Sequence, residues 1–338
     1  HEVRGFVLDA QYAAADVVVV RTPGHHFALR DTEVRRTSRD AIDIAAPDDV
    51  LVEGSLLHHA LNAAGGRRDA HGIAAGAVRR LTIRDTEIHT FSGDAIQVDP
   101  GRAAPGWNDV TIERCRLWLG PLPNPENGFA AGVVPGENAL DTKAASSLPR
   151  ARLVVRDTVA FGFRAGLIGN MAAFNLKENI DATLDGVTVY DSEIGFRVRG
   201  AGGDRAGALV SVRNAVVYGT AAAFRYEEAI ENLRVWNTTI GRDVRRAFVA
   251  AAARRPGLDV RNLLVLASAL PAEASHRSNR AARPDAFTDV TVHDYTLRRG
   301  SPAIDSGVAI PEVSTDRRGV RRPQHAAWDV GAYEFTRR

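Results

Sequence analysis

Residues 28–44 read ALRDTEVRRTSRDAIDI, and residues 81–98 read LTIRDTEIHTFSGDAIQV. Both stretches are made of short runs of alternating apolar and polar residues joined by turns at the same places, and weaker copies follow along the chain. The turn after the first run recurs every 23–31 residues, apart from one interval of 43 residues between positions 114 and 157. The aligned turn residues are Asp31, Gly54, Asp85, Arg114, Asp157, Gly186, Asn214, Asn237 and Asn262.

Asp, Asn and Gly dominate this turn, and they tolerate the left-handed backbone conformation that a sharp bend between two strands requires. The alternating runs are rich in Val, Ile, Leu and Thr and predict strands, whereas the leucines do not recur at the fixed positions of a leucine-rich repeat. We therefore predict a right-handed parallel β-helix of about nine to ten coils, stacked about 4.8 Å apart. One apolar series should point inward: Val34, Leu57, Ile88, Leu117, Val159, Val189, Val217, Ile240 and Val265.

We expect the coils to occupy residues 1–269, with insertions at 99–110 and 118–137, and residues 270–338 to form a connector and a C-terminal cap. The tail contains DYTLRRGSPAIDSG and RPQHAAWDVGAYEF, which resemble the C-terminal segment of many secreted bacterial right-handed β-helix proteins. A segment of this kind would close the end of the solenoid and protect an open sheet edge.

The 338-residue chain has 43 basic and 41 acidic side chains, a formal charge of +2, so we expect no nucleic-acid partner. Cys115 is the only cysteine, which excludes an internal disulfide and a cysteine-rich metal site. No apolar run approaches the length of about 18 residues that a membrane span needs. Because the chain begins at His1 and its one methionine is Met171, we expect that a leader has been removed and that the protein is a secreted, periplasmic or cell-surface monomer.

A second recurring strand predicts the outer surface where chemistry could take place. It reads AIDIA at 41–45, AIQVD at 95–99, ALDTK at 139–143 and GFRVR at 195–199, and its third and fifth residues should face outward. GLIGN at 166–170 fits the same pattern. Polar residues concentrate on successive coils at these outward positions: Gln97, Asp99, Asp141, Lys143, Asn170, Arg197, Arg199, Arg225 and Glu227.

An acidic half, a basic half and two nearby tryptophans suit a polysaccharide of uronic acids. Cleavage by β-elimination removes the proton at C5 and expels the oxygen at C4, after the neighbouring carboxylate has been neutralised by calcium. A Lys or Arg then takes the proton, and further arginines can bind substrate carboxylates. The predicted calcium ligands are Asp99, Glu137 and Asp141, with Asp94 as a further one. Lys143 is the first candidate for the base and Arg197 the second. The predicted substrate-binding residues are Arg199, Arg225, Asn170, Gln97, Trp107 and Trp118.

The arrangement is similar to the β-helical polysaccharide lyases, in particular the calcium-dependent pectate lyases of family nine. SRDAIDI (38–44), SGDAIQV (92–98) and GENALDTK (136–143) resemble the acidic calcium motif of that family, and IGFRVRG (194–200) resembles its Gly-Phe-Lys strand, with Arg197 at the position of the lysine base. This resemblance implies the β-helix fold, a calcium site and cleavage of an acidic polysaccharide. The sequence departs from the family in lacking adjacent aspartates and in offering Ile168 on the coil between Asp141 and Arg197.

Other functions on the same scaffold stay open. A glycoside hydrolase needs two carboxyl groups about 5–10 Å apart, and Asp99 with Asp141 on adjacent coils would meet this requirement. A uronate epimerase would share the proton abstraction without cleaving the chain. A binding or adhesion module would use the charged rows only as a docking surface, since one fold hosts many functions.

The histidines of the first coils offer a further interpretation. His58 and His89 occupy the same position one coil apart, preceded by Arg35 and followed by Trp118. Imidazoles are good ligands for a transition metal. The alternative, which we favour, is an outward ladder of stacked rings that continues along the coils to Phe161, Tyr190 and Tyr218.

Overall fold

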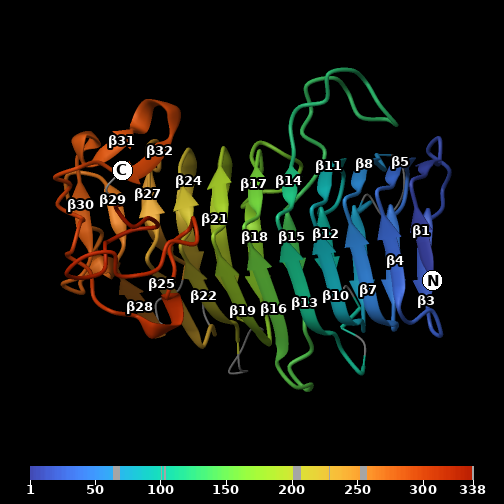
Figure 1. Ribbon diagram of the computed structural model, residues 1–338. Coiled ribbons are helices and arrows are strands. Elements are labelled where there is room, and N and C mark those ends of the chain that lie inside the picture. The colour runs from blue at the N-terminus through green and yellow to red at the C-terminus, as the bar shows by residue number, and fades with distance from the viewer. Residues whose placement is uncertain are drawn as a thin grey trace.

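The computed structural model describes residues 1–63, 69–99, 101–102, 104–200, 207–227, 229–251 and 257–336. The chain winds into a right-handed parallel β-helix whose coils succeed one another along the long axis, from the N-terminus at one end to the C-terminus near the other (Figure 1). Each coil up to β27 contributes one strand to each of three parallel sheets, which we name sheets A, B and C. This confirms the fold class predicted from the repeats.

Sheet A, the first sheet of each coil, consists of β1 (Glu2–Arg4), β4 (Phe27–Arg30), β7 (Asp48–Glu53), β10 (Arg79–Arg84), β13 (Asn108–Glu113), β16 (Ala151–Arg156), β19 (Ile180–Asp185), β22 (Leu209–Arg213), β25 (Asn232–Trp236) and β28 (Gly257–Arg261). Sheet B consists of β2 (Val7–Asp9), β5 (Glu33–Thr37), β8 (Leu56–Ala60), β11 (Glu87–Phe91), β14 (Arg116–Trp118), β17 (Val159–Phe161), β20 (Thr188–Tyr190), β23 (Val216–Val217), β26 (Thr239–Ile240), β29 (Leu264–Leu266) and β30 (Arg280–Ala282). Sheet C consists of β3 (Val18–Arg21), β6 (Ile42–Ala45), β9 (Ile73–Gly76), β12 (Ile96–Val98), β15 (Leu140–Thr142), β18 (Ala172–Lys177), β21 (Ser192–Arg199), β24 (Thr220–Tyr226) and β27 (Arg246–Ala250).

The bend between sheets A and B explains the repeated turn residue. All nine aligned residues have a positive φ, from 45° at Asn237 to 68° at Gly186, so the predicted left-handed conformation is confirmed. Arg114 is the exception among the Asp, Asn and Gly residues of this series. Its guanidinium donates two hydrogen bonds, of 2.8 and 2.9 Å, to the carboxylate of Asp85 one coil earlier, which helps to stabilise a conformation that arginine rarely adopts.

Apolar side chains fill the interior of the solenoid in stacked rows. The predicted inward series is buried except at one point: Ala160 occupies the inward position of β17, and Val159 lies only half-buried beside it. Ala160 points inward because it pairs with Leu117 and Val189 of the neighbouring coils. It is also the third residue after its turn, as are the other members of the series. Inside sheet C, Phe174, Phe196, Phe224 and Phe248 stack with their ring centroids 5.0–5.5 Å apart.

The predicted outward ring ladder runs along sheet B. Neighbouring ring centroids lie 4.0–5.8 Å apart, and the successive rings are His58, His89, Trp118, Phe161, Tyr190, Tyr218 and His293 of the cap. Burial, together with the neighbouring His58 and His59, lowers the pKa of His89 to about 3, which favours the neutral ring within the stack. Across the described ranges, no three His, Cys, Asp or Glu side chains gather closely enough to hold a metal ion. The ladder interpretation is therefore supported.

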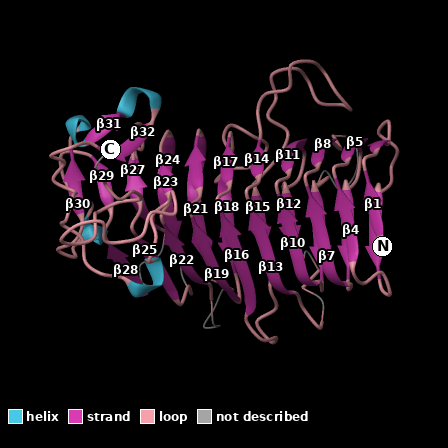
Figure 2. Cartoon of the chain, viewed as in Figure 1, coloured by secondary structure: helices cyan, strands magenta, loops and turns pink. Residues whose placement is uncertain are grey.

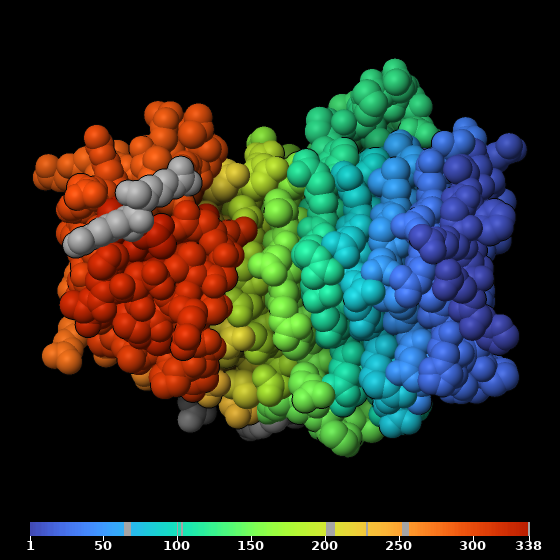
Figure 3. Space-filling model, viewed as in Figure 1, coloured from blue at the N-terminus to red at the C-terminus, as the bar shows by residue number. Residues whose placement is uncertain are grey.

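Residues beyond β29 form the cap at the C-terminal end (Figure 3). The four 3-10 helices of the described residues all lie in this cap (Figure 2). Sheet B continues into the cap through β30, beyond the boundary expected at residue 269. The remaining elements are the antiparallel pair β31 (Phe287–Asp289) and β32 (Asp294–Leu297), with η1 (Ala272–Ala274), η2 (Pro284–Ala286), η3 (Val290–Val292) and η4 (Pro311–Val313). In the part of the chain that is described, no helix has the length and apolar character to cross a membrane.

A buried ion pair connects the cap motif to the coils. The side chain of Arg322 is fully buried. Its Nη1 donates a hydrogen bond of 2.6 Å to Oε1 of Glu334, and its Nη2 donates one of 3.1 Å to Oδ1 of Asn214 in the coil. It also donates to the backbone carbonyls of Asp329 and Gly331. The guanidinium therefore links the tail to the turn of an inner coil.

We predict that Arg322→Met lowers the free energy of unfolding by about 3–5 kcal/mol, because it leaves Glu334 as an unpaired buried charge. Arg322→Met combined with Glu334→Met should recover much of this loss. Chemical denaturation measures both variants, and Arg318→Met, which removes an arginine that is 40% exposed in the same cap, should cost less than about 1 kcal/mol. A loss at Arg322→Met as small as that of Arg318→Met would contradict the role of the pair.

Candidate functional site

The outer surface of sheet C holds the candidate site, because its register aligns one outward residue from every coil. This first row is Val19, Asp43, Ala74, Gln97, Asp141, Asn175, Arg197, Arg225 and Val249. A second outward row, two residues further along each coil, includes Asp99, Lys143, Lys177, Arg199 and Glu227. Parallel strands lie about 4.8 Å apart, so these side chains form one continuous charged patch across the central coils.

One coil differs from the sequence prediction. Residues 166–170 lie in the connection between β17 and β18, so neither Ile168 nor Asn170 belongs to the rows of sheet C. The strand is β18, where Asn175 and Lys177 occupy the two outward positions. The signal was present in the sequence: AFNLK at 173–177 has the pattern of GFRVR at 195–199 and of AFRYE at 223–227. The less regular GLIGN stretch obscured it.

Asp141 lies at the centre of the patch between two lysines from successive coils. Nζ of Lys177 is 2.8 Å from Oδ1 of Asp141, and Nζ of Lys143 is 3.7 Å from Oδ2. Nδ2 of Asn175 also donates to Oδ1, at 2.8 Å. Burial raises the pKa of Asp141 to about 6, the neighbouring Asp94 adds to the rise, and the two ammonium groups oppose it. The exposed fractions of the lysine side chains are 13% for Lys177 and 21% for Lys143, so both ammonium groups sit at the border between protein and solvent.

Asp94 and Glu137 lie beside this centre at the entry to sheet C. The carboxylate of Asp94 is buried and accepts hydrogen bonds from Nε2 of Gln97 and from the backbone N–H and Nδ2 of Asn138, at 2.8–3.1 Å. Burial raises the pKa of Asp94 as well. Burial and the charges of Asp94, Asp69 and Asp141 raise the pKa of Glu137 to about 8, while Lys143 lowers it. Glu137 is therefore largely protonated at neutral pH.

Three arginines surround one glutamate on the next two coils. Nε of Arg197 and Nε of Arg199 lie 2.8 and 2.9 Å from the two carboxylate oxygens of Glu227, and Nε of Arg225 lies 3.3 Å from Oε1. Burial raises the pKa of Glu227, but the three guanidiniums outweigh that effect and hold it below its usual value. Oδ1 of Asn170 accepts a hydrogen bond of 2.6 Å from Nη1 of Arg225. The cluster has an excess of two positive charges.

Residues in the connections that follow the strands of sheet C hold the backbone next to the two lysines in place. Arg102 donates to both carboxylate oxygens of Glu178, which follows Lys177, and Oε2 of Glu178 also accepts from the backbone N–H of Ala144, which follows Lys143. The indole N–H of Trp107 donates a hydrogen bond of 2.8 Å to the backbone carbonyl of Lys143, and the side chain of Trp107 is buried. Trp107 therefore supports Lys143 and does not present a free ring to the surface.

The structure thus brings most of the predicted site residues together and leaves out two, Trp107, which is buried, and Trp118. Trp118 lies on sheet B within the ring ladder, where its indole N–H donates to Oε1 of Glu87, and so it does not adjoin the patch. Asp99 is buried next to Lys143 in the second row. The predicted residues that share the patch or its border are Asp94, Gln97, Asp99, Glu137, Asp141, Lys143, Asn170, Arg197, Arg199 and Arg225. Sequence reasoning missed Asn175 and Lys177.

The donor set fits calcium poorly. Calcium takes six to eight oxygen ligands at about 2.3–2.6 Å, mainly from ionised carboxylates and carbonyls. Asp141 already contacts two ammonium groups, and Asp94 already accepts hydrogen bonds from Gln97 and Asn138. Burial raises the pKa of Glu137 to about 8, which disfavours the ionised form that a calcium ligand needs. The chemistry proposed below therefore does not use calcium, and the predicted role of calcium stays a prediction.

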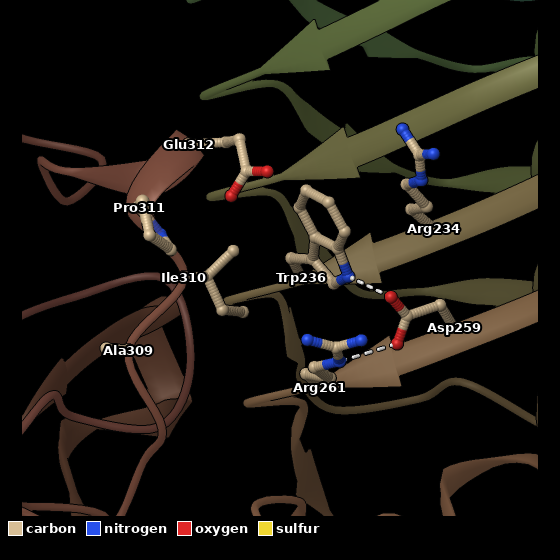
Figure 4. Close-up of a pocket in the computed structure, with 8 residues that line it drawn as sticks. All are labelled: Arg234, Trp236, Asp259, Arg261, Ala309, Ile310, Pro311 and Glu312. Atoms are coloured by element: carbon tan, nitrogen blue, oxygen red, sulfur yellow. Dashed lines mark hydrogen bonds and ion pairs between the residues drawn. The ribbon is translucent and has the colours of Figure 1, made fainter.

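Two of the cavities among the described residues lie on the other sheets and are lined by several charged side chains. One of about 350 Å³ separates the outer surface of sheet A from the cap (Figure 4). There Asp259 accepts hydrogen bonds from the indole N–H of Trp236 and from Nε of Arg261, while Ile310 lies opposite. The other, of about 250 Å³, lies on sheet B and is lined by Arg35, Arg36, His58, His59 and Glu126. Most of their charged side chains already pair with one another or with neighbours, so we place the candidate site on sheet C.

The comparisons with known proteins concern the fold. No protein-family model matches the chain, and no curated protein matches its sequence. Among solved structures, pectate lyase Pel9A aligns over 98% of this chain and 77% of its own, with 13% identity and a TM-score of 0.54. The pectate lyase pelN from Paenibacillus sp. 0602 aligns over 76% of this chain and 69% of its own, with 10% identity and a TM-score of 0.49. At these identities the likeness establishes a parallel β-helix and no activity.

The pKa of Glu137 predicts a dependence of stability on pH. A carboxyl whose pKa is raised on folding binds its proton more tightly in the folded state, so wild-type stability falls as the pH rises from about 4.5 to about 8. Glu137→Gln removes this titration. We expect the variant to match the wild type near pH 4.5 and to exceed it above pH 8, by roughly 1–3 kcal/mol after allowing for partial solvation.

Thermal or denaturant unfolding between pH 4 and pH 9 measures this difference. Glu312→Gln, a substitution at an exposed glutamate of the cap, serves as the control and should not change the pH profile. If the stabilities of Glu137→Gln and the wild type differ by a constant amount across this range, the pKa assigned to Glu137 is contradicted.

Proposed function

We propose that the protein is a polysaccharide lyase that cleaves a uronic-acid-containing polysaccharide by β-elimination at the outer surface of sheet C. The observation that supports this most directly is the pair Lys143 and Lys177, which flank Asp141 from successive coils and precede the cluster of Arg197, Arg199 and Arg225 in the same rows. Such a surface offers a base and several fixed cations to an anionic polymer.

In the proposed reaction, Lys143 acts in its neutral amine form, accepts the C5 proton of a uronate residue and becomes an ammonium. It is the more exposed lysine and the one farther from Asp141, so it has greater freedom to reach the substrate. The C5–H electron pair forms the C4–C5 double bond, the C4–O bond breaks, and the departing oxygen takes a proton from water. The ammonium of Lys177 stabilises the charge that develops on the C5 carboxylate during this step.

The arginine cluster would bind the carboxylates of neighbouring sugar residues. Guanidinium groups recognise carboxylates through paired hydrogen bonds, and Arg197, Arg199 and Arg225 share only one carboxylate, that of Glu227. Asn170 holds Arg225 in position through its side-chain oxygen, and Arg197 serves here in binding in place of the base role that the family resemblance implies. An extended polysaccharide of this kind is an extracellular substrate, which supports a secreted or cell-surface location.

The experiment is a screen of pectate, alginate and glycosaminoglycans that follows the ultraviolet absorbance of the unsaturated product. We expect one acidic polymer to give this absorbance. Lys143→Gln should lower kcat on that polymer by at least about 100-fold because it removes the base. Arg79→Gln, on sheet A and 57% exposed, should leave the rate unchanged. Full activity in Lys143→Gln, or no product from any acidic polymer, would contradict the proposal.

The environment of Glu137 favours a second candidate, a glycoside hydrolase. A carboxylic acid with a pKa of about 8 beside a carboxyl with a pKa of about 6, that of Asp141, is the kind of pair from which hydrolases take a general acid and its partner. New reducing ends without ultraviolet absorbance, abolished by Glu137→Gln, would identify hydrolysis in place of elimination.

A further inference from the structure

We propose that the enzyme cleaves its polysaccharide near a chain end and releases a mono- or disaccharide, because the basic residues that would hold an anionic chain lie on one side of Lys143 only. This inference concerns the place of cleavage along the polymer. It rests on the proposed function, in which Lys143 is the base, and it is carried by the order of the outward residues along sheet C.

The basic residues of the patch lie on four consecutive strands, of which the coil of Lys143 is the first. The strands are β15, β18, β21 and β24, and the outward basic residues are Lys143, Lys177, Arg197, Arg199 and Arg225. This stretch is about 14 Å long, since neighbouring strands lie about 4.8 Å apart. Its basic side chains share two carboxylates, those of Asp141 and Glu227, so basic groups are in excess and can bind the carboxylates of a substrate.

The coils that precede β15 have a different composition at the same positions. The outward residues of β12, β9 and β6 are polar, small or acidic: Gln97, Asp99, Ala74, Gly76, Asp43 and Ala45. On β3, Arg21 donates a hydrogen bond of 2.9 Å to the backbone carbonyl of Asp43 and also pairs with its carboxylate. At the described row positions of this side, a bound uronate would therefore lie near acidic side chains and find no cation without a carboxylate partner.

The connection from β14 to β15 narrows the same side of the patch. It rises beyond β14 and bends over the coils nearer the N-terminus (Figure 1). Nδ2 of Asn127 donates to the backbone carbonyl of Leu61, and the hydroxyl of Tyr12 donates to Oε1 of Glu126, both at 2.5 Å. Tyr12 and Leu61 lie in the bends between sheets B and C of these earlier coils. The connection therefore covers the edge of sheet C there, whereas a single residue separates β20 from β21 on the later coils.

These features determine how a chain would lie along the rows. Its reacting uronate would be at Lys143 and most of its length over the arginines, because an anionic sugar gains from opposite charges and loses from like ones. Only a short piece would extend toward Asp99. The bond that breaks is then close to a chain end, and this holds for either direction of the polymer because the basic residues lie on one side in both cases.

The first test follows the products from the acidic polymer that gives ultraviolet absorbance, by size-exclusion chromatography and viscosity. We expect a mono- or disaccharide from the earliest time points, while the viscosity falls little as the absorbance rises. A ladder of intermediate lengths with an early loss of viscosity would overturn this inference and would leave the elimination reaction of the proposed function in place.

A variant that adds a cation tests the cause. Gly76→Lys places an ammonium in the second outward row, two coils before Lys143, and a Cβ at Gly76 would meet only Oδ1 of Asp99, at 3.9 Å, so there is space for the side chain. We expect Gly76→Lys to release longer products than the wild type. The matched control Gly76→Gln adds a side chain without charge and should keep the wild-type products. Equal product lengths from the two variants would overturn the proposal.

Binding separates this inference from the proposed function. Titration calorimetry on Lys143→Gln uses oligomers of galacturonate, guluronate and glucuronate of increasing length. We expect the affinity to rise until an oligomer spans about 14 Å and then to level off. Lys143→Gln/Gly76→Lys should bind the longer oligomers about two- to fivefold more tightly.

The possible results of the binding experiment have different consequences. An affinity that keeps rising with length in Lys143→Gln would overturn this inference alone. The expected plateau, together with a wild type that cleaves none of the polymers, would contradict the proposed function alone. No binding of any of these oligomers would overturn both.

Discussion

The in-register stacking of parallel coils is the constraint on which every other feature of this protein depends. Hydrogen bonds between strands of successive coils fix each residue beside its counterpart about 4.8 Å away, although 16 to 44 residues of chain separate the two. A slip of one residue would exchange the inner and outer surfaces of a strand. The apolar interior prevents such a slip, because the stacked phenylalanines of sheet C and the aliphatic rows of sheets A and B fit only one register.

Because the register is fixed, the site consists of residues at the same row position on successive coils and not of residues that are close together in the sequence. Asp141, Asn175 and Arg197 come from three coils and lie side by side, as do Lys143, Lys177 and Arg199 in the second row. The charge therefore changes along the solenoid axis, from carboxylates on the earlier coils to guanidiniums on the later ones. In the proposed function, such a gradient would orient an anionic polymer along the solenoid, whereas a single motif would orient only one sugar residue.

The sequence predicted the fold well because its signals are local and repeated. The turn residues, the inward apolar series and the ring ladder all follow from spacing, and the one error among them, Val159 for Ala160, places the inward residue two positions after the turn instead of three. The site was harder to predict. GLIGN imitates a sheet C strand and obscures the AFNLK pattern at 173–177, although residues 162–171 are a connection and β18 begins at Ala172. Lys177 was therefore missed.

Burial was the second quantity that the sequence did not reveal. Trp107 was predicted to bind substrate, but its indole is buried and supports the backbone of Lys143. The acidic residues looked like a calcium site, yet Asp141 contacts two lysines and Asp94 is buried among hydrogen-bond donors. These differences depend on which way side chains turn after the coils have stacked, and residue spacing contains no information about that.

The most direct test of the central claim is the energetic coupling between Lys177 and Asp141, 36 residues apart in the chain. A double-mutant cycle with Lys177→Gln, Asp141→Asn and the combined variant measures it from free energies of unfolding. The account predicts a coupling of about 1–3 kcal/mol, because the pair is nearly buried and in direct contact. Additive effects, within about 0.5 kcal/mol, would contradict the arrangement of coils and side chains on which the site is built.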